Sequence, residues 1–296
     1  MLRALRLLSH IPLGIPHPVG AAMGWLAFLA SPGYRRRLWN QAGLAGLSVG
    51  QRLAAVGQAG KMVAEVPHLW CRPVDQRLER RVRWQGVELL DQAVAEGRGV
   101  MLLTPHLGCF EVTAQAYAER HGTQHPVTAL YRPAKQAGLA TLMTHARNRP
   151  GMRVSPATLT GVRQLMRALK QGDTIGVLPD QVPPEGMGEW APFFGQPAYT
   201  MTMASKLAAQ TGCALVLLRG ERLGMVQRWR QRCDFIVHVS RLPPEQDAAV
   251  RQKDLSAATA AMNAVMQALI LQCPHQYLWG YNRFKGPRPD ILTSEG

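Results

Sequence analysis

Cysteine is scarce in this sequence and is not arranged in pairs. The five cysteines are an odd number, lie far apart along the chain and form no C-x-x-C motif. This pattern argues against both a disulfide framework and a zinc site, which need paired or closely spaced ligands. With 47% hydrophobic and 18% charged residues over 296 positions, the composition is that of a globular protein, and the unpaired thiols favour a reducing compartment.

Acidic residues are also few. Nineteen Asp and Glu oppose 34 Lys and Arg, which gives a formal net charge of +15 and a sequence pI near 10.4. Such a surface attracts anions, and nucleic acid, anionic lipid and an acidic carrier protein are the three candidate partners. Because the sequence carries no RNA-recognition motif and no zinc finger, nucleic acid is the least favoured of the three.

Long unbroken hydrophobic runs are absent as well. The apolar N-terminal stretch over 11–30 is interrupted by prolines, and its uninterrupted part, 19–30, falls short of the roughly 20 residues that span a bilayer. A run of three arginines follows at 35–37. We expect this stretch to lie on a membrane surface or to insert shallowly, with the arginines meeting lipid phosphates. A buried first helix followed by a solvated basic face is the alternative that these residues leave open.

Several motifs of common enzyme classes are missing. The sequence has no G-x-x-x-x-G-K-[ST], no G-x-G-x-x-G after a strand and no H-E-x-x-H, so neither a nucleotide site nor a metal site is expected. It also lacks the G-x-S-x-G elbow of serine hydrolases. Cys109 lies near a histidine and an acid, but we interpret it as a packing residue at a helix start and not as a nucleophile.

Hydrophobic patterning predicts strands that alternate with helices. The expected strands cover 82–85, 99–104, 127–131, 174–178, 214–218 and 235–239. The expected helices cover 40–70, 87–96, 111–121, 139–147, 160–171, 203–211 and 255–272. This alternation indicates an α/β fold with a mixed, largely parallel central sheet flanked by helices. We expect a membrane-associating helical segment, an apolar anchor, over 1–45 and one catalytic domain over 46–296.

The most informative stretch follows the expected strand that ends at 103–104. Pro105 stops that strand and Gly108 permits a tight turn, so His106 is expected in a loop at the carboxyl edge of the sheet, where sites of α/β proteins gather. Glu111 then falls in the first turn of the next helix. A carboxylate bonded to one imidazole nitrogen leaves the other free to take a proton from a hydroxyl. Asp180 also follows the end of a strand.

Five short blocks in a fixed order carry a resemblance to a known family. They are the apolar N-terminus with Arg-Arg-Arg-Leu-Trp-Asn, His-x-x-x-x-Glu at 106–111, Tyr-Arg-Pro at 131–133, Asp-Gln and Phe-Phe-Gly between 180 and 195, and Trp to Arg-Phe-Lys at 279–285. With these blocks the sequence resembles the late acyltransferases of bacterial lipid A biosynthesis, the lauroyl and myristoyl transferases, within the lysophospholipid acyltransferase superfamily.

The resemblance implies roles for individual residues. His106 would be the general base and Glu111 its orienting partner. Arg132, Arg149, Asp180, Gln181 and Arg283 would bind or support the substrates, and neither a metal nor an organic cofactor would be needed.

The resemblance further implies a place and partners. The protein would work at the cytoplasmic face of the bacterial inner membrane, taking an acyl chain from acyl carrier protein and giving it to a hydroxyl of an anionic lipid A precursor, without nucleic acid. A lysophospholipid or an aminolipid is the alternative acceptor. A non-catalytic basic protein that binds membranes or nucleic acid is the alternative of a different class.

Overall fold

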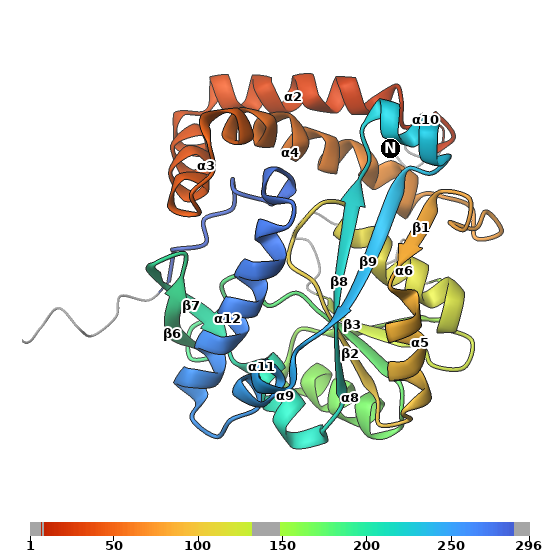
Figure 1. Cartoon of the computed structure of the whole chain (residues 1–296), viewed down its shortest axis with the longest axis vertical. Helices are drawn as coiled ribbons and strands as arrows, with labels where there is room; N and C mark the ends of the chain where they lie inside the picture. Colours follow the sequence, from red (N-terminus) through yellow and green to blue (C-terminus); the bar gives the residue numbers. More distant parts are fainter. Residues whose placement is uncertain (1–6, 8, 132–148, 287–296) are drawn as a thin grey trace, which may run out of the picture.

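The computed structural model describes residues 7, 9–131 and 149–286 (Figure 1). The helices are α2 (Pro16–Ala30), α3 (Pro32–Leu44), α4 (Val49–Trp70), α5 (Val87–Ala95), α6 (Phe110–His121), α8 (Leu159–Lys170), α9 (Met203–Thr211), α10 (Met225–Gln231), α11 (Pro244–Val250) and α12 (Leu255–Leu271), with a 3-10 turn, η1 (Pro274–Gln276). The strands are β1 (Val82–Gln85), β2 (Val100–Leu103), β3 (Val127–Tyr131), β4 (Met152–Pro156), β5 (Thr174–Val177), β6 (Gly188–Phe193), β7 (Gln196–Met201), β8 (Ala214–Arg222) and β9 (Phe235–Arg241).

Seven strands form the central sheet in the order β1-β9-β8-β2-β5-β3-β4. Every neighbouring pair is parallel except β8 and β9, which run antiparallel. The predicted mixed, largely parallel sheet is therefore confirmed. A separate two-stranded hairpin, β6–β7, lies beside α12 (Figure 1).

Strand β2 is buried on both faces because helices cover the sheet on each side. Val100 and Leu102 belong to one core cluster, with apolar residues of α5 and α6, whereas Met101 and Leu103 belong to the other, with residues of α8, α9 and α12. The alternation follows from the two-residue period of a strand. It explains why this part of the sequence reads as a continuous apolar run.

The N-terminal helices pack against this body through one of their faces. Helix α2 crosses α4 closely because glycines meet there: a Cβ on Gly60 would lie 1.8 Å from the carbonyl oxygen of Gly20. Phe28 and Leu38 reach the second core cluster. Among the described residues, none of the helices combines the length and the apolarity that a bilayer-spanning segment requires. The predicted anchor is thus not confirmed, and the boundary at 45/46 stays a prediction.

The prediction of secondary structure from the sequence was incomplete. The helix expected over 40–70 is broken, because Ser48 and Gln51 form a capping box that starts α4 separately. Strand β4, the β6–β7 hairpin and the short helices α10 and α11 were not predicted. The helix expected over 139–147 lies outside the described residues.

Candidate active site

Two neighbouring strands bring the candidate base and an acid together. Strands β2 and β5 are parallel and pair Leu103 with Val177. His106 lies three residues after Leu103, and Asp180 three residues after Val177, so both leave the sheet at the same edge. Their closeness is a consequence of strand register, although they are 74 positions apart in the sequence.

Asp180 holds His106 by two hydrogen bonds. The Nδ1 atom of His106 lies 2.8 Å from Oδ1 of Asp180, and the backbone N–H of His106 donates to Oδ2 at 2.9 Å. Burial alone raises the pKa of Asp180, but His106 and then Arg283 outweigh burial, and the pKa lies below its ordinary value. The carboxylate is 1% exposed and the imidazole 16%, so Nε2 is the nitrogen that can meet a substrate hydroxyl.

The turn after His106 requires glycine. Gly108 has a φ of +60°, and a Cβ there would lie 2.0 Å from the carbonyl oxygen of Gly220. The C-terminal segment fastens this turn, because Gly108 donates to the carbonyl of Gln276 at 3.0 Å and Leu278 donates to the carbonyl of His106 at 3.1 Å. Phe110 packs against the imidazole, with 4.7 Å between ring centroids.

Glu111 lies in the first turn of α6, as the sequence indicates, and is half-buried. The hydrogen bond at Nδ1 of His106 is made by Asp180, whereas the sequence predicts Glu111 as the orienting partner. The orienting role of Glu111 therefore stays a prediction, and Asp180 moves from a substrate-supporting residue to the partner of the imidazole.

Arg283 is a buried cation close enough to Asp180 to affect its pKa. It is 2% exposed, and its amino groups donate to the Tyr199 carbonyl at 2.8 Å and to Oγ1 of Thr200 at 2.6 Å. Its positive charge lowers the pKa of Asp180, whereas burial and the nearby Asp180 raise the pKa of Tyr277 well above its usual value. Direct contact between Arg283 and substrate stays a prediction that this burial disfavours.

The remaining predicted site residues are more scattered. Gln181 follows Asp180 and is half-buried at the same edge of the sheet. Arg149 donates to the carbonyls of Leu69 at 3.0 Å and Arg72 at 2.7 Å, at the end of α4, and burial and Arg72 lower its pKa to about 10. Arg132 lies outside the described residues.

The sequence did not predict a buried ion pair that contacts the turn after His106. Glu65 of α4 accepts from Arg222 through both carboxylate oxygens, and Arg222 also donates to the carbonyl of Gly108 at 3.1 Å. His17 of α2 bonds the same carboxylate at 2.8 Å. The only signal in the sequence was an acid within an apolar helical segment, which by itself does not identify a partner.

Cys109 is a packing residue, as the sequence indicates. It precedes α6, is 3% exposed, and burial and Glu65 raise the pKa of its thiol well above the usual value. A thiol of this kind is a poor nucleophile. Among the described residues, no group of three or more His, Cys, Asp or Glu is placed to hold a metal ion.

A histidine held by a buried acid at the carboxyl ends of two parallel strands is an arrangement in which α/β enzymes place a general base. Comparison with known proteins gives the family. Residues 48–286 match the model of the bacterial lipid A biosynthesis acyltransferases. The chain belongs to this family and is an acyltransferase.

Curated relatives agree with this assignment. The chain is 28% identical over 248 residues to a lipid A biosynthesis lauroyltransferase of Escherichia coli K12, covering 83% of this chain and 72% of that protein. It is 27% identical over 228 residues to a palmitoleoyltransferase of the same organism, covering 76% and 68%. It is also 27% identical over 175 residues to a phosphatidylinositol mannoside acyltransferase of Mycobacterium tuberculosis H37Rv, covering 55% and 51%.

Proposed function

We propose that this protein transfers a fatty acyl chain from an acyl-carrier-protein thioester to a hydroxyl of a lipid A precursor, with His106 as general base. The hydrogen bond between Nδ1 of His106 and the buried carboxylate of Asp180 carries this proposal. It fixes the tautomer in which Nε2 is unprotonated, and the negative charge of Asp180 stabilises the imidazolium that forms during the reaction.

In the proposed reaction, Nε2 of His106 removes the proton of the acceptor hydroxyl while its oxygen attacks the thioester carbonyl. The tetrahedral intermediate collapses with loss of the carrier thiolate, which takes the proton back from the imidazolium. The acyl chain passes directly to the acceptor, so no enzyme nucleophile is needed. This agrees with the burial of Cys109.

The developing oxyanion needs hydrogen-bond donors. Helix α6 starts at Phe110, just after His106, and has no side-chain cap at its N-terminus. The positive end of the helix dipole favours negative charge there. Arg132, expected from the family resemblance, is the second proposed donor. Glu111, in the same first turn, is the second candidate, beside Asp180, for the acid that orients His106.

The charge of the protein supports an acidic donor and an anionic acceptor. A net charge of +15 favours encounter with a negatively charged carrier protein and with a negatively charged leaflet. The carrier is proposed on this charge and on the family, and the same two observations support the proposed location at the cytoplasmic face of the inner membrane.

Exposed apolar side chains give a surface that suits this location. On α2, Val19, Met23, Leu26 and Leu29 are exposed, with the arginine run at 35–37 just beyond the helix. On α10, Met225, Val226 and Trp229 are exposed, and Trp229 reaches 81%. Figure 1 places α2 and α10 at the same end of the molecule. Apolar residues bordered by arginine fit the boundary between headgroups and acyl chains.

The test is acyl transfer by purified protein, with acyl carrier protein as donor and a lipid A precursor as acceptor, followed by lipid mass spectrometry. The wild type should add the mass of one acyl chain, and His106→Ala should lose about 10² to 10⁴ in rate while remaining folded. The matched control is His121→Ala, because His121 also bonds an aspartate, Asp91, at 2.8 Å but on another part of the surface.

Equal rates for His106→Ala and wild type would refute the mechanism. A mass shift only on a lysophospholipid or an aminolipid would keep the mechanism and replace the acceptor.

A further inference from the structure

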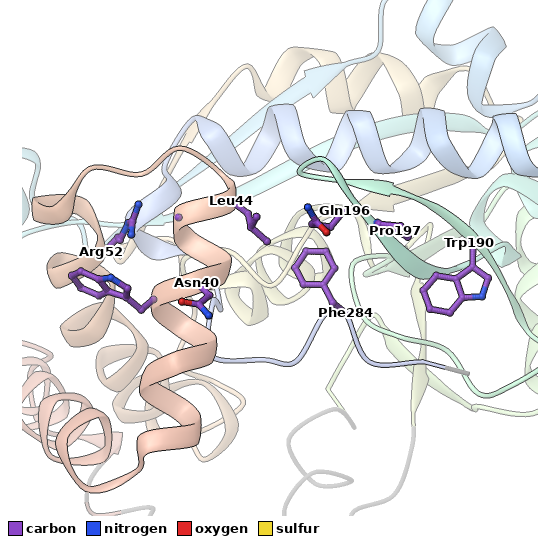
Figure 2. Close-up of a pocket in the computed structure, with 9 residues that line it drawn as sticks. Asn40, Leu44, Arg52, Trp190, Gln196, Pro197 and Phe284 are labelled. Carbon is purple, nitrogen blue, oxygen red and sulfur yellow. The ribbon is translucent and has the colours of Figure 1, made fainter. Parts of the chain in front are cut away.

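A cleft of about 800 Å³ lies between the N-terminal helices and the β6–β7 hairpin. Asn40 of α3 and Arg52 of α4 line one side, Trp190 and Gln196 of the hairpin line the other, and Phe284 lies between them (Figure 2). Trp39 of α3 also lines the cleft. Its size falls in the range of about 300–1,000 Å³ that small-molecule sites occupy. None of the residues placed in the acyl transfer step lines it.

The lining combines flat aromatic faces with planar polar groups. Three rings, two carboxamides and one guanidinium are present, and Asn40 and Gln196 are exposed at the rim. An acyl chain would be better served by an entirely apolar lining, because the polar groups would lose water without gaining a partner. A sugar ring has C–H groups that pack on aromatic faces and hydroxyls that need donors and acceptors at its edge.

We propose that this cleft is a saccharide subsite, which holds a sugar ring of the acceptor's headgroup while its reacting hydroxyl meets His106. The proposal rests on the acyl transfer function proposed above. Two kinds of relative, the lipid A biosynthesis palmitoleoyltransferase and the phosphatidylinositol mannoside acyltransferase, are each named after a glycolipid.

Arg52 is set in place before any ligand binds. Its Nε donates to the carbonyl of Leu47 at 2.9 Å, and its guanidinium lies over the Trp39 ring at 5.3 Å from the centroid. On the other side is Gly43, where a Cβ would lie 3.1 Å from the guanidinium. Within the described part of the chain, this is the only hydrogen bond that the Arg52 side chain makes to another residue, whereas its backbone N–H bonds Ser48. The two terminal amino groups can therefore donate to a hydroxyl or a phosphate of the headgroup.

The cleft and the catalytic pair share one segment of chain. Leu278 bonds the carbonyl of His106, and Phe284, six residues later, lines the cleft. Six residues reach at most about 20 Å, so the backbone of Phe284 at the cleft lies within that distance of Leu278, which bonds the loop of His106. Gln41, beside Asn40, fixes this arrangement by donating to the carbonyls of Trp279 at 2.9 Å and Tyr281 at 2.6 Å.

The cleft also lies at a suitable depth below the proposed membrane surface. Helix α3 starts at Pro32, next to the end of α2, and its cleft residues begin at Trp39. With a rise of 1.5 Å per residue, the cleft begins about 10 Å along the helix axis from the junction with α2. A headgroup that leaves the bilayer beside α2 can reach it.

The experiment separates this subsite from the chemistry. The full-length His106→Ala protein is titrated calorimetrically with the deacylated saccharide headgroup of lipid A and, for comparison, with glycerophosphoethanolamine. We expect binding of the saccharide only. Adding Asn40→Ala and Gln196→Ala should weaken it about tenfold through two lost hydrogen bonds. Gln246→Ala, an exposed glutamine on α11, is the matched control and should leave binding unchanged.

Steady-state kinetics on the otherwise wild-type chain give a second readout. The double variant should raise the KM of a glycolipid acceptor about tenfold with kcat retained, since the lost contacts are present in ground and transition states alike. Equal binding of the saccharide by parent and double variant, or equal binding of glycerophosphoethanolamine, would overturn the subsite even if acyl transfer occurs. Loss of saccharide binding in the double variant supports the subsite even if no acyl transfer is found.

Discussion

Glu65 and Arg222 form a buried ion pair in which both oxygens of the carboxylate accept from one guanidinium, although the residues are 157 positions apart. Both side chains are almost fully inaccessible, at 2% and 1% exposure. Arg222 also donates to the carbonyl of Gly108, in the turn that follows His106. The pair thereby joins the N-terminal helices to the loop that carries His106.

Removing one partner of this pair should destabilise the protein strongly. Arg222→Met leaves the Glu65 carboxylate buried without its main partner, and the expected cost is about 3–5 kcal/mol of unfolding free energy. Glu65→Leu combined with Arg222→Met should cost less than Arg222→Met alone, because the uncompensated charge is gone. Urea unfolding of the single and double variants gives the coupling energy.

The matched control is an exposed pair of the same geometry. Arg120 donates to Asp91 through two nitrogens at 2.8 and 2.6 Å, and both side chains are more than a third exposed. Arg120→Met should cost about 1 kcal/mol or less. Comparable losses at the two pairs would contradict the large cost expected when the buried Glu65 carboxylate loses Arg222.

The same pair predicts a dependence of stability on pH. Burial raises the pKa of Glu65, but Arg222 and His17 outweigh burial and bring the pKa down to about 2. A pKa that is depressed in the folded state contributes stability above the unfolded value, near 4.3, and the contribution disappears as the pH falls toward 2. The unfolding free energy of wild type minus that of Glu65→Gln should therefore shrink below pH 4.5. A difference that is constant from pH 7 to pH 3 would be the opposite result.

Two acids compete for the role of partner to His106, and activity separates them. Asp180→Asn keeps the shape of the side chain but removes the charge that stabilises the imidazolium, so we expect a loss of about 10² to 10⁴ in kcat. Glu111→Gln is measured in parallel, with circular dichroism to confirm the fold of each variant. If only Glu111→Gln were inactive, the hydrogen bond between Asp180 and His106 would be structural.

Cys109 should be dispensable for chemistry. Cys109→Ala should retain turnover and lose about 1 kcal/mol of stability, since it removes one small packed group. Iodoacetamide should not inactivate the native enzyme, because all five cysteines are buried, and it should label all five after unfolding in urea. Rapid inactivation of the native protein by the reagent, prevented in Cys109→Ala, would point to a reactive thiol instead.

The apolar surface of α10 should contribute to membrane binding. Trp229→Ser should weaken sedimentation of the protein with anionic phospholipid vesicles about tenfold, because burial of a large side chain is worth about 1.5–3 kcal/mol. Val154→Ser is the control, since Val154 is also exposed but lies on β4, at one edge of the sheet. Equal binding of both variants and wild type would remove α10 from the proposed membrane surface.

The sequence alone determined the fold class and the position of the candidate base. Residues 100–103 are apolar at every position, which a strand buried on both faces requires, and Pro105 and Gly108 end that strand in a turn. The position of His106 at the sheet edge followed from these local features. The family followed from the order of its short motifs, and the family model confirmed it.

Only the tertiary structure decided which residues meet. Asp180 reaches His106 because β2 and β5 are adjacent and in register, and strand order is a non-local property that no sequence window reports. The Glu65–Arg222 pair and the cleft beside Phe284 likewise join segments that are far apart along the chain. Local patterns set where each strand and turn begins, whereas packing of distant segments sets the partners of each charged group.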